Sequence, residues 1–107
     1  MLLTSQGSAG VSPLALALFL REDEQLVGAT NGANITFLIP DSKKALNQEP
    51  GVKVKVYYNG QRLHEGGVND FIVIESGGAG TGFDTVLLSF PPLSGDLVSA
   101  DYIIVNR

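Results

Sequence analysis

The sequence predicts an all-β protein with an antiparallel β-sandwich or jelly-roll-like fold and an N-terminal arm. From residue 34 onward, short β-branched and aromatic runs alternate with clusters of Gly, Pro, Asn and Asp, a spacing typical of sandwiches and barrels. The chain also has 13 glycines and only 17% charged residues, which favours strands and turns over long solvated helices. Its 107 residues suffice for one domain. We expect an arm or peripheral element over residues 1–27 and the sandwich over residues 28–107.

The composition argues against several classes of function. The chain has no cysteine, which excludes disulfides, cysteine-ligated metal sites and thiol catalysis. Lys and Arg total 7 against 11 Asp and Glu, and the resulting charge of -4 opposes binding to nucleic-acid phosphates. We therefore expect no cofactor, no metal and no nucleic-acid partner.

The longest apolar run, Pro13 to Leu20, is too short to cross a bilayer, since a spanning helix needs about 20 residues. No basic residue precedes Arg21, so the run also lacks the charged start of a secretion signal. We expect a protein that is made inside the cell and does not enter a membrane.

Two conformations are open for the segment that contains this run. Leucine occupies every second position from Leu14 to Leu20, which is the period of a strand and is slightly favoured. Alternatively, Ser12 could cap a helix that has Pro13 at its first position and ends near Leu26. Residues 1–12 have little apolar periodicity and are expected to form a loose arm.

The first strands follow from local signals. Ile35–Ile39 is a β-branched run that ends at Pro40, which cannot donate to a sheet ladder. In Val52–Tyr58, the even-numbered residues share one face and the odd-numbered residues share the other. Asn59-Gly60 follows directly and favours a type I′ turn, so Gln61–Leu63 should fold back as a hairpin partner.

The later strands complete the predicted sandwich. Phe71–Glu75 and Thr85–Phe90 flank the glycine-rich loop 77–82 and predict a second hairpin. After the turn 91–96, Leu97–Val105 forms the last strand. Alternation within these runs predicts a core made of Ile35, Phe37, Val54, Val56, Phe71, Val73, Val86, Leu88, Tyr102 and Ile104.

Three residue groups could carry chemistry, and each has a simpler interpretation. The loop Gly77–Gly82 lacks the following helix and the nearby lysine that a phosphate loop needs, so a hairpin tip is favoured. His64 beside Glu65 could act as an oriented base, but the chain shows no nucleophile motif, and we expect no enzymatic activity. The acidic run 22–24 matches no calcium loop and is predicted to be a solvated turn.

Aromatic residues give a weak signal for a glycan site. Tyr57 lies on the polar face of its predicted strand, whereas Tyr58 belongs to the apolar face and should be part of the core. Together with Phe83, these are the rings that could line a sugar-binding face. One or two rings do not establish such a site.

A set of turn and core residues resembles a β module that recurs in virion proteins of tailed bacteriophages. In that module a strand ends in an Asn-Gly hairpin, an Asp-Phe strand follows, and a Pro-x-x-Gly-Asp turn precedes a final strand with an inward Tyr. The resemblance covers about residues 28–105. The matching residues are Asn31-Gly32-Ala33-Asn34, Ile35-Thr36-Phe37, Pro40, Val54 to Leu63, Asp70-Phe71, Leu88 to Phe90, Pro92, Gly95-Asp96 and Tyr102.

The resemblance implies a structural virion protein of a tailed bacteriophage, made in the bacterial host cytoplasm and located in the virion. It would be a capsid decoration or cement protein, or a tail or connector subunit; the alternative is a receptor- or glycan-binding module of a phage fibre. Implied partners are the major capsid or tail protein and other copies of this chain. The apolar run has no place in the module and is the candidate partner contact, through Leu14, Leu16, Leu18, Phe19 and Leu20.

Overall fold

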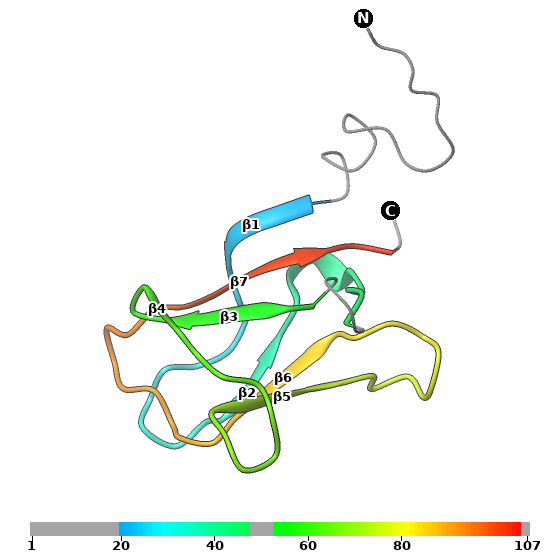
Figure 1. The fold of residues 1–107 in the computed structure, drawn as a ribbon. Helices are drawn as coiled ribbons and strands as arrows, with labels where there is room; N and C mark the ends of the chain where they lie inside the picture. The colour runs from blue at the N-terminus through cyan, green and yellow to red at the C-terminus, as the bar shows by residue number, and fades with distance from the viewer. Residues whose placement is uncertain (1–19, 48–52, 106–107) are drawn as a thin grey trace, which may run out of the picture.

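The computed structural model describes residues 20–47 and 53–105, which form two antiparallel sheets packed as a sandwich (Figure 1). One sheet has the strand order β1-β7-β3-β4 and the other has the order β2-β6-β5. The predicted all-β antiparallel fold is confirmed. The elements are β1 (Leu20–Gln25), β2 (Thr36–Leu38), the 3-10 turn η1 (Pro40–Ser42), β3 (Lys55–Tyr58), β4 (Gln61–Arg62), β5 (Phe71–Ile74), β6 (Thr85–Leu88) and β7 (Val98–Ile103).

Both predicted hairpins are present. Asn59 and Gly60 have φ values of 51° and 83°, and they join Tyr58 directly to Gln61 between β3 and β4. Positive φ at both central residues defines the type I′ turn, whose twist matches that of the strands beside it. Strands β5 and β6 pair from Phe71↔Leu88 to Ile74↔Thr85, with the glycine-rich loop as their tip.

Strand β7 lies at the centre of the four-stranded sheet. It pairs with β1 on one side and with β3 on the other, so it joins strands from the beginning and the middle of the described chain to its last strand. Every second residue of the segment faces the core, as predicted: Val98, Ala100, Tyr102 and Ile104 are all buried. The first and last described strands are therefore held side by side.

The segment before residue 28 is partly a strand of this sheet. Residues 20–25 form β1, so the strand interpretation is confirmed there, while residues 13–19 lie outside the described part of the chain. Leu26 is 3% exposed in the core, and Val27 is hydrogen-bonded to β2. Within the predicted arm or peripheral element 1–27, residues 20–25 therefore form an edge strand beside β7, and Val27 pairs with β2.

Single bridges join the two sheets along both edges. At one edge, Val27 and Leu38 exchange backbone hydrogen bonds of 2.9 and 2.8 Å. At the other edge, Glu65 forms a parallel bridge with Phe71. Ala45 also bridges both Phe83 and Ile104, and so ties the margins of the two sheets together. The sandwich is consequently closed on itself at several points.

The core confirms most of the predicted residues. Eight are buried: Phe37, Val54, Val56, Phe71, Val86, Leu88, Tyr102 and Ile104. Val73 is partly buried and packs against them. The prediction that Ile35 belongs to the core is wrong, since this residue is 39% exposed. It precedes the first residue of β2 and lines a surface hollow with Ile72 and Leu87, so the strand period does not extend to it.

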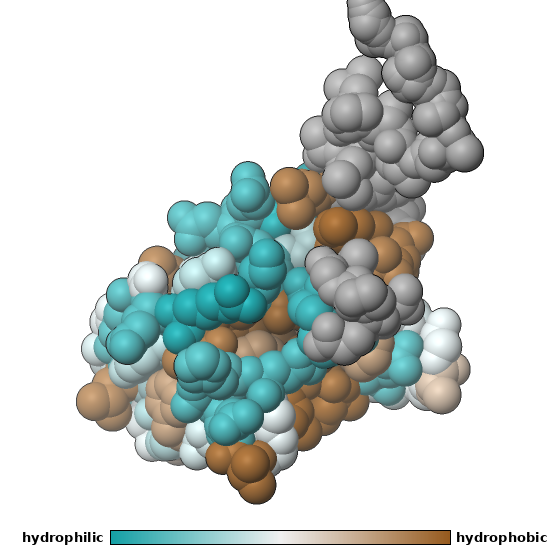
Figure 2. Space-filling model, viewed as in Figure 1, coloured by the Kyte–Doolittle hydropathy of each residue, from teal (hydrophilic) through white to brown (hydrophobic). Residues whose placement is uncertain are grey.

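The surface carries polar and apolar areas on the same side of the molecule. In Figure 2, hydrophilic side chains cover the middle of the visible face, over β3 and β4, whereas apolar side chains reach the surface toward its lower margin. Exposed large apolar residues include Val27, Leu38, Ile72 and Leu93.

Candidate functional site

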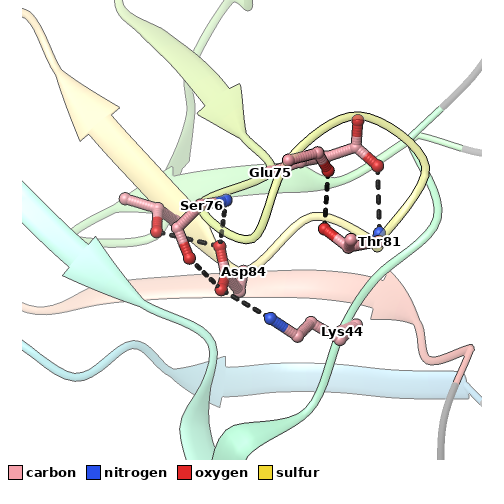
Figure 3. A network of polar contacts seen from close by, with 8 residues as sticks. Lys44, Glu75, Ser76, Thr81 and Asp84 are labelled. Atoms are coloured by element: carbon pink, nitrogen blue, oxygen red, sulfur yellow. Dashed lines mark hydrogen bonds and ion pairs between the residues drawn. The ribbon is translucent and has the colours of Figure 1, made fainter.

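A polar network fixes the loop between β5 and β6 against the segment after η1 (Figure 3). The Asp84 carboxylate accepts hydrogen bonds from Lys44 Nζ at 2.8 Å, Ser76 N at 3.0 Å, Ser76 Oγ at 2.5 Å and Thr85 Oγ1 at 3.0 Å. Partial burial disfavours the charged form of Asp84. The ion pair with Lys44 and the hydrogen bonds from Ser76 and Thr85 outweigh that effect and hold the pKa of Asp84 well below its usual range.

The glycine-rich loop already holds an anion of its own. Glu75 Oε2 accepts hydrogen bonds from the backbone N–H groups of Gly80, at 3.1 Å, and Gly82, at 2.9 Å. Thr81 Oγ1 donates to the Gly78 carbonyl at 2.6 Å. Two of the loop's backbone donors are thus satisfied by a carboxylate within the same hairpin. The hairpin-tip interpretation agrees with this geometry.

An apolar surface pair borders a hollow of about 410 Å³ beside the Lys44–Asp84 ion pair. Val27 and Leu38 line this hollow. Their backbones are hydrogen-bonded to each other, and the two residues are 53% and 45% exposed. We call these two residues the Val27–Leu38 patch. The hollow is also lined by η1, where Asp41 and Ser42 have φ values of 61° and 57°. Consecutive left-handed residues other than glycine are costly and are typical of functional loops.

A second network locks the two turns at the other end of β7. The Asp96 carboxylate accepts hydrogen bonds from Tyr58 Oη, from Leu93 N at 2.8 Å and from Asn59 Nδ2 at 3.1 Å. Leu97 N donates to Asn59 Oδ1 at 2.7 Å, and Asn59 N donates to the Leu97 carbonyl. The Asn-Gly hairpin and the Pro-x-x-Gly-Asp turn therefore stabilise each other, and these donors lower the pKa of Asp96.

The three candidate aromatic residues do not form one platform. Tyr58 faces the core side and meets Phe90 edge to face, with ring centroids 4.8 Å apart. Tyr57 points to the outer face of the sheet, where its hydroxyl donates to Asp101 Oδ2 at 3.1 Å. Phe83 lines a separate hollow together with Ala45 and Gly82. Only Tyr57 is placed to meet a ligand from solvent on the β3 surface.

The other polar candidates lie among contacts within the domain. The His64 backbone pairs with Asp70 and Phe71, and the Glu65 carboxylate binds Asn47 Nδ2 and Lys53 Nζ. Across residues 20–47 and 53–105, no group of three or more His, Asp or Glu side chains could hold a metal ion. Residues 22–24 lie in β1 at a register shift, so they form a bulged strand in place of the predicted turn.

Of the predicted partner contacts, Leu14, Leu16, Leu18 and Phe19 lie outside the described residues. Leu20 is the first residue of β1, opposite Ile103, and is 37% exposed. The sequence did not single out the Val27–Leu38 patch, because the bridge between these residues is a tertiary contact. The sequence signals available for this patch were Gly28, which follows Val27, and the alternation of residue types within Thr36–Leu38.

Comparison with known proteins found no matching family model, no matching curated protein and no matching solved structure. In the part of the chain that the structure describes, no helix is long and apolar enough to span a membrane. The fold and the surfaces described above are therefore the basis for any functional conclusion.

Proposed function

We propose that this chain is a structural virion protein of a tailed bacteriophage that acts through protein–protein contacts. Its role would be that of a capsid decoration or cement protein, or of a tail or connector subunit, with the major capsid or tail protein and further copies of itself as partners. The observation that carries the proposal is the exposed Val27–Leu38 patch, which borders a hollow on the joined edge of the sandwich. Exposed apolar surface of this kind marks contact sites.

The architecture suits a rigid structural subunit. Asn59 and Asp96, which belong to the residues that resemble phage virion modules, are the centre of the network that locks two turns together. Tyr102, the inward tyrosine of that pattern, is 2% exposed in the core. These residues support rigidity of the domain, and a rigid domain loses little entropy when it joins an assembly.

The N-terminal apolar run adds a second contact in this proposal. Among the described strands, β1 pairs only with β7 and lies at the edge of its sheet. The run that leads into β1 in the sequence contains Leu14, Leu16, Leu18, Phe19 and Leu20. An extended apolar segment that docks on a neighbouring subunit adds effective concentration to a small interface.

The test is incorporation into particles. The protein, and a variant with Val27→Asp and Leu38→Asp, are produced during infection by the phage that encodes the chain, and purified particles are analysed by quantitative mass spectrometry. We expect a fixed copy number per particle for the wild type and strong depletion of the variant. A matched control, Val68→Asp, changes a residue that is 98% exposed outside the patch and should be incorporated normally.

Circular dichroism first verifies that both variants are folded. The proposal fails if the wild-type protein is absent from purified particles. It also fails in its choice of surface if the Val27 and Leu38 variant is incorporated as well as the wild type.

A further inference from the structure

A shallow hollow of about 300 Å³ lies on the outer face of the four-stranded sheet. Its floor and walls come from β3 and β7, because Tyr57 pairs with Ser99 across the two strands and Asp101 follows on the same face. Asp23, Gly60 and Leu97 complete the lining. Residues from β1, the β3–β4 turn and β7 thus meet at one place on the surface.

The Asp101 carboxylate is held in a fixed orientation. Its Oδ1 accepts a hydrogen bond from Asp23 N at 2.8 Å, and its Oδ2 accepts one from Tyr57 Oη at 3.1 Å. Asp23 has a φ of 54° at the register shift of β1, which bends its backbone N–H toward Asp101. A carboxylate oriented by two donors still has lone pairs available for further donors.

Ser99 supplies an independent sign of a ligand. It is only 3% exposed and lies between Tyr57 and Gln25 in register, on the face that lines the hollow. No group in the described residues forms a hydrogen bond with its hydroxyl. A buried hydroxyl without a hydrogen-bond partner destabilises the folded protein, so such groups call for an explanation. A ligand group that enters the hollow would satisfy it.

We propose that this hollow binds one ring of a saccharide. The Tyr57 ring offers an aromatic surface for the C–H face of a pyranose, Asp101 accepts hydrogen bonds from sugar hydroxyls, and Ser99 can donate to or accept from a third hydroxyl. A volume near 300 Å³ lies at the lower end of ligand sites and suits a single ring. The inference goes beyond the structural role proposed above and shares no residue with the Val27–Leu38 patch.

The charges around the hollow favour a neutral polyol over a basic side chain. Arg62 lies directly opposite Tyr57 across β3 and β4, and Lys55 lies directly opposite Asp101 across β3 and β7. These cations offset the two carboxylates, so a lysine or arginine from a partner gains little attraction there. Burial, and then the hydrogen bond and charge of Asp101, raise the pKa of Tyr57, so its phenol stays protonated and keeps donating to the carboxylate.

The site is tested with the full chain on a printed array of defined glycans, followed by NMR titration with the methyl pyranoside of the strongest terminal sugar. We expect at least one class of terminal sugar to bind. Tyr57→Ala and Asp101→Asn should each weaken binding by about tenfold, since each removes one strong contact. Val68→Ala, which changes a residue that is 98% exposed and does not line the hollow, should bind within about twofold of the wild type.

Ser99→Ala separates recognition from folding. The variant removes a hydroxyl that has no partner within the described residues, so its stability should equal or exceed that of the wild type while sugar affinity falls several-fold. The proposal is overturned if no glycan on the array binds, or if binding survives both Ser99→Ala and Tyr57→Ala unchanged. It is also overturned if a lysine-rich peptide, and no sugar, shifts the NMR signals of the hollow.

Discussion

Replacing Asp84 with Asn should destabilise the domain, because one carboxylate serves four donors. Asn keeps the shape of Asp but has one acceptor oxygen, and its NH₂ group would face donors from Lys44, Ser76 or Thr85. Hydrogen bonds to a charged group contribute about 1.5 to 3 kcal/mol each, and shared partners make them less than additive. The Asp84 side chain is 18% exposed, so solvent screens part of the interaction. We expect a loss of about 2 to 4 kcal/mol at pH 7.

The effect should depend on pH in a defined direction. The pKa of Asp84 is depressed in the folded protein, so its stabilisation is present above the pKa of the unfolded chain, near 3.8. As the pH falls below about 4, the unfolded state takes up a proton that the folded state does not. Wild-type stability then declines by up to about 1.4 kcal/mol per pH unit from this group alone. The difference between the wild type and Asp84→Asn should therefore shrink between pH 4 and pH 2.

Urea denaturation followed by circular dichroism, from pH 7 to pH 2, measures both effects. Asp41→Asn is the matched control: it removes the same charge from an exposed residue, and Asn also tolerates the left-handed backbone of that position. Its stability should stay within about 0.5 kcal/mol of the wild type. Equal free energies of unfolding for Asp84→Asn and the wild type at pH 7 would refute the assigned role of the network, and so would a difference that does not change with pH.

Substitutions at three further positions test the fold. Gly60→Val places a β-branched residue at a φ of 83° and should lower the free energy of unfolding by about 1 to 3 kcal/mol in urea melts, whereas Gly60→Asn should cost far less; equal losses for both would contradict the type I′ turn. Gly28→Ala puts a Cβ 2.5 Å from Phe37 Cδ2, so thermal melts should show a loss of about 1 to 3 kcal/mol, and an unchanged melting temperature would show that this approach is not close. Burial raises the pKa of Tyr102 to about 12, so the stability it contributes is present below pH 10 and is lost as the pH rises toward 12. Tyr102→Phe should be as stable as the wild type at pH 7 and less sensitive to alkali, as measured by urea melts at pH 7 and pH 11; a large loss at pH 7 would reveal a hydroxyl partner.

Local signals predicted the strands and turns that depend on neighbouring residues. The alternation from Val98 to Ile104 and the Asn59-Gly60 turn could be predicted because period and turn chemistry act over a few positions. The exposure of Ile35 could not be predicted, because the strand period does not reveal where the opposite sheet ends. The place of β1 beside β7 also requires a pairing between distant residues.

The candidate sites were less accessible to sequence reasoning than the fold. Tyr57 could be identified as an outward aromatic, but Ser99 and Asp101 join it only through the register between β3 and β7. The Val27–Leu38 patch likewise depends on a bridge between the two sheets. Surfaces built across strands depend on the register between distant segments, which could not be read from local patterns in one sequence.

The central position of β7 constrains how the chain can fold during synthesis. Strands β1 and β3 do not pair with each other, and both need β7, residues 98–103, which is translated last among the strands. The hydrogen bond from Asp23 N to the Asp101 carboxylate, for example, joins positions 78 residues apart. Long-range closure of this kind slows folding and leaves strand edges open in the nascent chain. On the ribosome, β5 and β6 can pair early, but the four-stranded sheet must assemble after its final strand has emerged.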